Sequence, residues 1–361
     1  MKNLNEIYSQ IKFSTIMTTG RTGSDYLQAC LDNVPGILTF CGHFPYYRFC
    51  DNLKLNKFEE REPIKILELF IHENYHLLTK DDIENKNINL DIQKFTENFI
   101  HVCEKENLTR QKFLLSLYLA YHLTLGRDTS NINILVHHSH TYDETRRFLE
   151  DFKNSKLLIT IRDPRANLKS GILNWIKYDE KRENQRHFYI YIKKIREDLK
   201  FVQKQMNEKF FLKLEEANDI IIKKKLSSFL DVKFSPEIMK ATFADKIWIG
   251  DKLSRFNSKD GGYNKSVINN QWENFFSKKD KLVLNLIYKD YRLFGYKINE
   301  INWIKKASIF FLIPLPFVFD KNTFSLKYFF KKNISTRKKI KNIVYYIKRI
   351  LYLYKSLFRL D

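Results

Sequence analysis

The stretch STIMTTGRTGSDYL, residues 14–27, decides the fold of this chain. Its first six residues are typical of a buried strand, while Gly20 and Gly23 predict a tight loop before a helix that begins near Ser24. A strand, a glycine loop and a helix in this order direct backbone N–H groups and the positive end of the helix at an anion. The stretch therefore predicts an α/β protein that binds a phosphate or a sulfate at this corner.

The loop differs from the phosphate loop of NTPases. That loop has the pattern G-x-x-x-x-G-K-[ST], in which the lysine reaches the terminal phosphates and the hydroxyl holds magnesium. Here no lysine follows the second glycine, and the basic residue is Arg21, whose guanidinium offers a fork of donors to anionic oxygens. We expect Arg21 and the hydroxyls of Thr22 and Ser24 to contact the anion. A P-loop-like nucleotide kinase or another NTP-binding protein is the main alternative.

A second segment, LLITIRDPRANLKSGILNW at residues 157–175, has the form of a buried strand followed by a helix. Its first five residues are apolar and β-branched, as in a strand of a parallel sheet. Asp163 suits the cap of the helix and Pro164 its first position. Arg162 at the strand end and Ser170 on the helix could then converge on a second phosphate.

Together the two segments resemble the sulfotransferases that use 3′-phosphoadenosine 5′-phosphosulfate (PAPS), in particular the carbohydrate and tyrosylprotein branches and their bacterial relatives. GRTGS at residues 20–24 is similar to the family's loop for the 5′-phosphosulfate, and RDPRANLKS at residues 162–170 to its R-D-P-R-x-x-x-x-S element for the 3′-phosphate. Downstream, FLKLE at residues 211–215 is similar to the family's strand that ends in a glutamate. Residues 271–272 (QW) and 294–296 (FGY) are similar to its closing element.

The resemblance covers roughly residues 12–300 and implies a fold, a reaction and a set of binding residues. The fold is α/β, with a P-loop-like, mostly parallel central sheet and helices on both faces. The reaction is transfer of a sulfuryl group from PAPS to a hydroxyl or amine of a carbohydrate, glycolipid or similar acceptor, and it needs no metal. PAPS is expected across the carboxyl ends of the strands. The residues predicted to bind it are Gly20, Arg21, Thr22, Gly23, Ser24, Asp25, Arg162, Ser170 and Lys265.

Asp25 departs from the pattern of the family, which usually has Ser or Thr at this position. A carboxylate next to a bound anion is unfavourable unless it faces away or pairs with Arg21. At the N-terminus of a helix, however, an aspartate favours the helix dipole and can act as a cap. We therefore predict an orienting or capping role for Asp25.

Three residues are predicted to take part in the transfer itself. Arg21 stabilises the charge that builds up on the transferring group. His43, in FCGHF at residues 40–44, is the predicted general base, because an imidazole accepts a hydroxyl proton near neutral pH. His138, or alternatively His140, in HHSH at residues 137–140 after an apolar run, stands where the family often has a polar residue near the sulfuryl group. Metal binding by this cluster and a structural role are the alternatives.

A competing motif is HENYH at residues 72–76, which matches the H-E-x-x-H pattern of zinc enzymes. In that pattern two histidines on one helical face bind zinc and the glutamate acts as base. The apolar residues of the helix predicted at 64–78 leave Glu68, His72 and His76 along a polar stripe. We therefore predict a solvated face here, and no metal in the function of the chain.

The chain has 361 residues and a net charge of +21, which predicts an anionic partner. Residues 304–361 carry +12 of this charge and form a second region after a catalytic domain predicted at residues 1–303. From Ile340 to Phe358, apolar residues recur at helical spacing with a basic opposite face. Such a helix typically binds an anionic membrane surface. The alternative is a helix that packs on the catalytic domain. Nucleic acid is not expected as a partner.

The first ten residues are polar and lack the apolar core of a signal peptide. The four cysteines have no spacing typical of a disulfide framework or a metal site: Cys30, Cys41, Cys50 and Cys103. These features predict a cytoplasmic enzyme that is either soluble or peripheral on the inner face of the membrane. A non-enzymatic basic membrane adaptor is the third alternative, and it leaves the two anion motifs unexplained.

Overall fold

The computed structural model forms two compact units. Unit 1 contains residues 1–161 and 204–268, and unit 2 contains residues 162–203 and 269–361. The boundary that the sequence predicts at 303/304 does not coincide with a unit boundary, since residues 304–361 fold within unit 2. The structure describes residues 3–53, 62–79, 90–103, 108–179, 188–248, 250, 263, 272–320 and 335–358.

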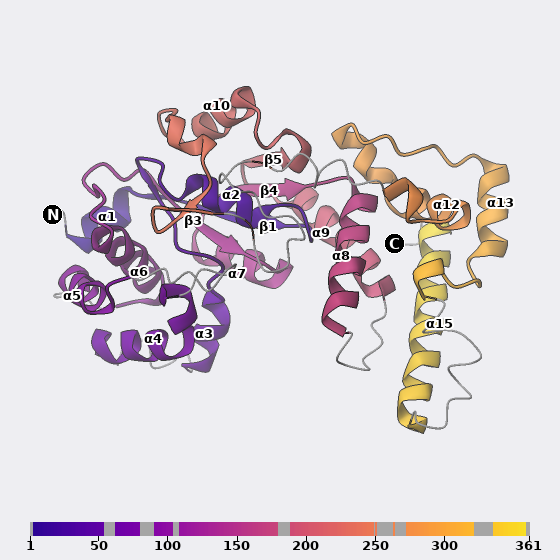
Figure 1. The fold of residues 1–361 in the computed structure, drawn as a ribbon, viewed down its shortest axis with the longest axis horizontal. Helices are drawn as coiled ribbons and strands as arrows, with labels where there is room; N and C mark the ends of the chain where they lie inside the picture. Colours follow the sequence, from indigo (N-terminus) through magenta and orange to yellow (C-terminus); the bar gives the residue numbers. More distant parts are fainter. Residues whose placement is uncertain are drawn as a thin grey trace. The chain divides into compact units, whose positions relative to one another are not determined.

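Unit 1 is built on a five-stranded parallel sheet (Figure 1). The strand order is β2-β3-β1-β4-β5, so β1 lies at the centre with β3 and β4 on its two sides. A central parallel strand is buried on both faces and therefore carries few charged residues. The predicted α/β fold with a mostly parallel central sheet is confirmed. The strands are β1 (Lys12–Thr18), β2 (Ile37–Leu38), β3 (Ile134–Ser139), β4 (Lys156–Ile161) and β5 (Lys209–Lys213).

Helices surround this sheet and bury two apolar clusters against it (Figure 1). One cluster joins α3, α4, α5 and α6, while the other joins α2, α10 and the inner strands. A short antiparallel pair, β6 (Thr242–Phe243) and β7 (Lys246–Ile247), completes the described part of the unit. The helices are α1 (Leu4–Gln10), α2 (Ser24–Leu31), α3 (Tyr46–Asn52), α4 (Pro63–Thr79), α5 (Ile92–Cys103), α6 (Arg110–Thr124), α7 (Tyr142–Asp151) and α10 (Ile220–Phe229).

A buried ion pair fixes the end of α2 in unit 1. The Asp32 carboxylate is fully buried and accepts a hydrogen bond from Arg127 Nη2 at 3.0 Å. Hydroxyls of Thr39, Tyr121 and Thr242 lie 3.3–3.4 Å from the same carboxylate. A buried charge with this many partners holds α2 in one position, because removing a partner leaves the charge without compensation.

Two strands end differently from the prediction. β3 does not stop at Val136 but continues to Ser139, because its register with β1 extends to Met17↔Ser139. Its two histidines can be buried inside the sheet because each ring has a hydrogen-bond partner. For His137 this partner is the Tyr118 hydroxyl, which lies 2.8 Å from Nδ1. β5 ends at Lys213, and a 3₁₀ turn follows, so the predicted glutamate lies in the turn rather than at the end of the strand.

Unit 2 is helical in the part that the structure describes. The long helix α15 packs on α12 and α13 through buried residues that include Arg349, whose guanidinium donates to the carbonyls of Ile313 at 3.0 Å and Leu315 at 2.7 Å. None of the described helices has both the length and the apolar character needed to cross a membrane. The helices are α8 (Pro164–Asp179), α9 (Phe188–Lys204), α12 (Lys278–Ile287), α13 (Trp303–Leu312) and α15 (Thr336–Phe358).

Candidate active site

The loop between β1 and α2 depends on two glycines with left-handed backbone conformations. Gly20 has a φ of 110° and Gly23 a φ of 83°, values that side chains other than glycine rarely adopt. A β-carbon at Gly23 would also lie 2.5 Å from Leu214 Cδ1, so the tip of that side chain would have to shift. The sequence pattern of the loop therefore follows from its backbone path.

Threonine hydroxyls attach this loop to β4. Thr22 Oγ1 shares hydrogen bonds with Thr160 Oγ1 at 2.7 Å and with Thr18 Oγ1 at 3.0 Å, and the Thr22 side chain is buried. The Thr22 N–H donates to the Gly20 carbonyl at 3.0 Å. The hydroxyl of Thr22, which the sequence predicts as an anion contact, thus joins the loop to β4, and the Thr22 N–H closes the loop onto Gly20.

The N-terminus of α2 is open at the end of the loop. Gly23 is its N-cap and has no side chain with which to accept from the first turn, and the first intrahelical bond runs from the Leu27 N–H to the Gly23 carbonyl at 3.0 Å. The N–H groups of Ser24, Asp25 and Tyr26 precede this bond, so they belong to the set that a helix leaves for a cap or an anion. Together with Arg21, this end of α2 has the geometry of an anion-binding corner.

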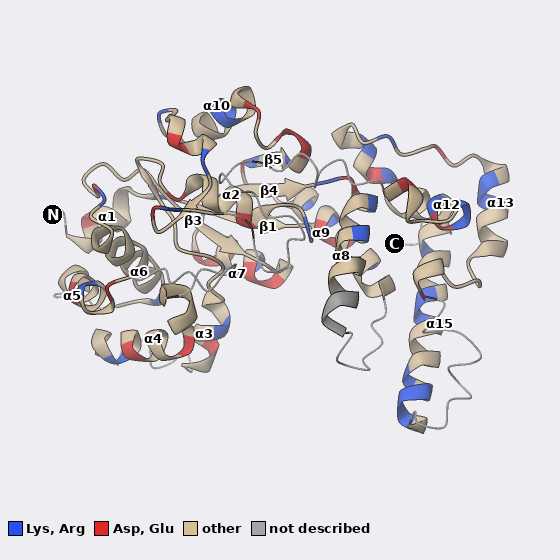
Figure 2. Ribbon diagram, viewed as in Figure 1, with Lys and Arg blue, Asp and Glu red and all other residues tan. Residues whose placement is uncertain are grey.

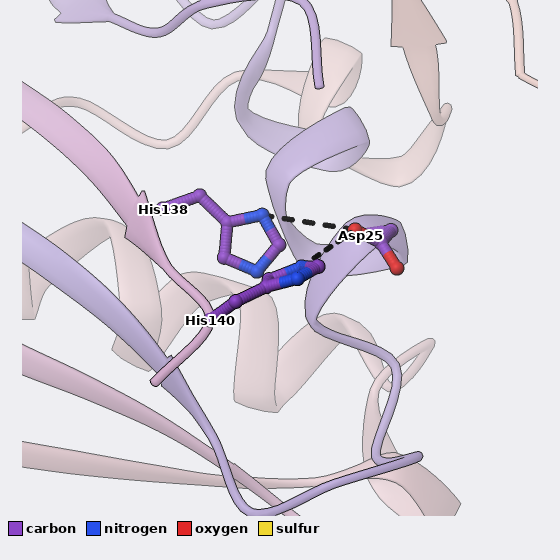
Figure 3. Close-up of side chains that lie close together, drawn as sticks. All are labelled: Asp25, His138 and His140. Atoms are coloured by element: carbon purple, nitrogen blue, oxygen red, sulfur yellow. Dashed lines mark ion pairs between the residues drawn. The ribbon is translucent and has the colours of Figure 1, made fainter. Parts of the chain in front are cut away.

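The Asp25 carboxylate faces two histidines at the end of β3 (Figure 3). Its Oδ1 lies 3.6 Å from His140 Nε2 and 3.7 Å from His138 Nδ1. Burial raises the pKa of Asp25, but His140, His138 and the charge of Arg21 outweigh burial and hold this pKa well below its ordinary value. Asp25 is therefore ionised. Of the orienting or capping role that the sequence predicted for Asp25, the capping role is wrong, because Gly23 occupies the cap position of α2.

Gln28 orients His138. The Gln28 side-chain N–H₂ group donates to the carbonyls of Phe40 at 2.7 Å and Gly42 at 2.9 Å, so its Oε1 is left as the acceptor. His138 Nδ1 lies 2.8 Å from that oxygen and must donate to it. Burial, followed by the charge of His140, holds the pKa of His138 well below its ordinary value. His138 is therefore neutral, with the lone pair on Nε2, a buried atom that has no hydrogen-bond partner among the described residues.

His43 lies beside this pair in the loop before α3. Its ring stacks on His140, with the ring centroids 3.8 Å apart and the planes 4° from parallel, and its centroid lies 5.8 Å from that of His138. His43 Nε2 is 3.5 Å from Glu144 Oε2. Burial lowers the pKa of His43 more than Glu144 raises it, whereas the pKa of Glu144 falls to about 2 because His43 outweighs the effect of burial.

The sequence brought attention to His43, His138 and Asp25, and the structure places all three in one cluster of unit 1. Gln28 and Glu144 were not predicted from the sequence. Gln28 lies three positions after Asp25, on the same face of α2, which is the signal that could have identified it. Glu144 has a local role as well, because its Oε2 accepts from the Thr141 N–H at 3.2 Å in the capping box of α7 and also from the His140 N–H at 2.9 Å.

The predicted binding residues Arg162, Ser170 and Lys265 lie outside the described part of unit 1. Arg162 directly follows β4 in the chain, but it and Ser170 belong to unit 2. At the start of α8, Asp163 Oδ1 accepts from the Arg165 backbone N–H at 2.9 Å, as its predicted capping role requires. Lys265 and the predicted Gln271 lie outside the residues that the structure describes.

The H-E-x-x-H motif lies on α4, away from the described metal-binding arrangements. His72, Glu73 and His76 are all exposed, in agreement with the predicted solvated face. In the described part of the chain, the group with the geometry to hold a metal ion is instead Asp25, His138 and His140.

Comparison with known proteins gives structural neighbours only. The sequence matches no family model and no curated protein. The structure is similar to a sulfotransferase domain of the curacin biosynthetic pathway, with a TM-score of 0.49 and 15% identity over 80% of this chain and 99% of that chain. For a sulfotransferase domain of the Synechococcus PCC 7002 olefin synthase the TM-score is 0.44 and the identity 13%, over 83% of this chain and 98% of that chain. For a mouse sulfotransferase complexed with PAP the TM-score is 0.38 and the identity 12%, over 84% of this chain and 91% of that chain.

Proposed function

We propose that this chain transfers a sulfuryl group from PAPS to a hydroxyl or amine of an acceptor. The observation that carries the proposal is the corner between β1 and α2, where an open helix N-terminus follows a loop with two left-handed glycines and an arginine. Such a corner binds an anion, and it lacks the lysine that a nucleoside triphosphate needs. The histidine cluster at Asp25, in the same unit, offers groups that can accept a proton.

In this reaction the acceptor oxygen forms a bond to sulfur while the bond between sulfur and the bridging phosphate oxygen breaks. The acceptor loses its proton, and PAP (3′-phosphoadenosine 5′-phosphate) leaves. Arg21 and the first N–H groups of α2 stabilise the negative charge that moves onto the bridging and equatorial oxygens. This is the step to which an anion-binding corner contributes, because its donors already point at the site before the charge develops.

His43 accepts the proton of the acceptor in this proposal. It is neutral, as a base must be, and Glu144 at 3.5 Å from Nε2 stabilises the imidazolium that forms. His138 is the second candidate, since Gln28 fixes its tautomer and leaves Nε2 able to accept. Both histidines are neutral because they are buried, so their protonation states do not show which of them is the base. Substituting each histidine in turn distinguishes the two candidates.

The 3′-phosphate of PAPS is assigned to Arg162 and Ser170, with Lys265 closing over the nucleotide. This assignment rests on the R-D-P-R-x-x-x-x-S element of the sequence. The same element would distinguish PAPS from ATP, because ATP has no 3′-phosphate. We further propose a saccharide or glycolipid as the acceptor, on the basis of the basic surface of the chain.

An anionic membrane surface is the proposed partner of α15. The helix has no acidic residue and carries exposed lysines, including Lys341, Lys348 and Lys355 (Figure 2). Six further exposed residues of the helix are apolar and recur at helical spacing: Ile340, Ile343, Val344, Ile347, Leu351 and Phe358. An exposed apolar stripe with basic flanks suits the interface of an anionic bilayer, and this supports our proposal of a peripheral enzyme on the inner face of the membrane.

Calorimetry with PAP and ATP tests the proposed activity. The purified chain is expected to bind PAP tightly and ATP weakly, and to transfer label from ³⁵S-PAPS into an extract of its source. Preferential binding of ATP would identify a nucleotide kinase or NTP-binding protein instead. Binding of neither nucleotide at millimolar concentration would remove the proposal and leave the basic membrane adaptor.

A further inference from the structure

We propose that Asp25, His138 and His140 form a binding site for a divalent transition-metal ion of the zinc class. Each of the three offers one ligand atom, and these atoms lie within 4.8 Å of one another (Figure 3). The proposed site adjoins the groups used in the proposed transfer of a sulfuryl group, since Asp25 lies in the first turn of α2 and His138 is the second candidate base, but metal binding is tested separately from that transfer.

The distances in the cluster are too long for hydrogen bonds and suit a shared ion. Asp25 Oδ1 and His140 Nε2 are 3.6 Å apart, whereas an N–H···O hydrogen bond spans about 2.7–3.2 Å. Two ligands of a tetrahedral zinc ion, each about 2.0–2.2 Å from the metal, lie about 3.3–3.6 Å apart. An ion between the carboxylate and the imidazole therefore accounts for the separation that a direct hydrogen bond does not.

Two nitrogen atoms of the cluster are buried without a hydrogen bond to a described residue, although His140 Nε2 lies 3.6 Å from Asp25 Oδ1 in an ion pair. His138 Nε2 and His140 Nε2 have no hydrogen-bond partner among the described residues, and the His138 side chain is only 1% exposed. A buried polar atom that is left unsatisfied costs about 1–3 kcal/mol, so such atoms call for an explanation. A metal ion satisfies both nitrogens at once.

The surroundings of His138 are those of a metal ligand. A ligating histidine usually donates its second ring N–H to a fixed acceptor, which sets the tautomer and the direction of the lone pair. His138 Nδ1 does so to Gln28 Oε1, and Gln28 is in turn held by the carbonyls of Phe40 and Gly42. Three hydrogen bonds, one to His138 and two from Gln28 to the backbone, thus fix the tautomer of His138 and leave the Nε2 lone pair free to bind an ion.

The other two ligands give an ion access and room to adjust. The side chains of Asp25 and His140 are 32% and 39% exposed, so an ion can reach them from solvent. Two imidazoles and one carboxylate favour zinc, cobalt or nickel over magnesium and calcium, which prefer oxygen ligands. Three protein ligands leave the fourth position of a tetrahedral ion for water or for a substrate oxygen.

Metal binding to the chelator-stripped chain tests this inference directly. We expect about one equivalent of Zn²⁺ by equilibrium dialysis, and Co²⁺ should give the visible absorption of a tetrahedral site. Asp25→Asn and His140→Gln are expected to weaken Zn²⁺ binding at least about 100-fold. Gln28→Leu should weaken it about 10–100-fold, because it removes the acceptor that orients His138. Circular dichroism shows whether each variant is folded.

His72→Gln is the matched control, since it removes an exposed histidine of the H-E-x-x-H motif on α4. Its Zn²⁺ affinity should equal that of the unsubstituted chain. Three results would each overturn the inference: no Zn²⁺ or Co²⁺ bound at micromolar concentration, equal binding by folded His140→Gln, or loss of binding in His72→Gln. PAP binding measured in the presence of chelator is independent of all three, so the proposed transfer can fail or hold separately.

Discussion

At the scale of single residues, Gly23 combines a backbone and a packing requirement. Gly23→Ala should destabilise the chain by about 1–3 kcal/mol, because its φ of 83° is strained for alanine and Leu214 must move away from the new β-carbon. The same change should weaken PAP binding by shifting the N-terminus of α2. Urea unfolding and calorimetry measure the two effects.

Gly126→Ala is the control for this prediction. Gly126 has a similar φ of 73°, but nothing lies within 4 Å of a β-carbon built there. It shares the backbone strain and lacks the contact, so it should cost less stability and leave PAP binding unchanged. If the two variants behave alike, the close approach of Leu214 has no part in holding the loop.

Arg162 provides the residue-scale test of the 3′-phosphate assignment. Arg162→Ala should lower the affinity for PAP about 10–100-fold, the equivalent of a charge-assisted hydrogen bond of about 1.5–3 kcal/mol. Affinity for adenosine 5′-phosphate, which lacks the 3′-phosphate, should change little. Arg146→Ala, at an exposed arginine of α7, serves as the control for general loss of charge. An equal loss for both nucleotides would contradict the assignment.

At the scale of elements, β3 shows what a sequence pattern can and cannot predict. The apolar run before His137 predicted the strand, but the histidines themselves were expected after its end. Their burial depends on partners in other elements, Tyr118 on α6 and Gln28 on α2, and no local pattern shows such partners. The same holds for Asp25, whose histidine partners come from a strand more than a hundred residues away in the chain.

The loop after β1 was predictable for the opposite reason. Gly20 and Gly23 are local requirements of the backbone, so the sequence alone indicates the turn and the start of α2. The role of Thr22 was not predictable, since its hydroxyl finds Thr160 on the neighbouring strand. Local geometry could be read from the sequence, while the use of each side chain depended on tertiary contacts.

The helix α15 allows the membrane proposal to be tested without disturbing its packing. Arg349 and Leu353 are buried within unit 2, so removing the whole tail would damage that unit. Ile347→Ser with Leu351→Ser instead changes two exposed positions and should reduce binding to anionic vesicles about tenfold or more. Sedimentation with phosphatidylserine vesicles measures this loss, and binding of the unsubstituted chain should fall as salt rises.

Met206→Ser is the control, because this methionine is 96% exposed and lies outside the apolar stripe of α15. It should leave vesicle binding unchanged. Vesicle binding that survives the double substitution on α15 would remove the membrane proposal.

At the scale of the whole molecule, the sequence predicted one catalytic domain followed by a tail, whereas the chain folds into two units whose residues alternate along it. Arg349 shows why the tail could not be recognised as part of a larger unit. In sequence it is one more basic residue of an amphipathic helix, but in the structure it is buried, 4.0 Å from Asp320, and bonded to backbone carbonyls. The parallel sheet, by contrast, was predictable from its apolar strands.

The same buried pair gives unit 2 a pH-dependent stability. Burial raises the pKa of Asp320 to about 7, with Asp280 adding to the rise and Arg349 and Lys279 opposing it. An acid whose pKa is higher in the folded state favours folding only while it is protonated. The free energy of unfolding should therefore fall as pH rises from about 4 to about 7, by up to about 4 kcal/mol.

Hydrogen exchange of the α15 amides across this pH range, analysed as free energies of opening, measures the effect. Asp320→Asn keeps the shape of the side chain and removes its charge, so it should abolish the pH dependence and stabilise unit 2 at pH 8. An unchanged slope in this variant would assign the dependence to another group.

Gln28 has a consequence for the recognition of similar chains. Its amide must donate to two carbonyls and accept from one histidine, so a glutamate, which differs by one atom, would set a carboxylate against both carbonyls. The cluster therefore corresponds to two short sequence patterns: D-x-x-Q at the start of the helix after the glycine loop, and H-x-H at the end of a later strand. Where a distant sequence contains both patterns in this order, the same arrangement of side chains is to be expected, even at identities too low for ordinary alignment.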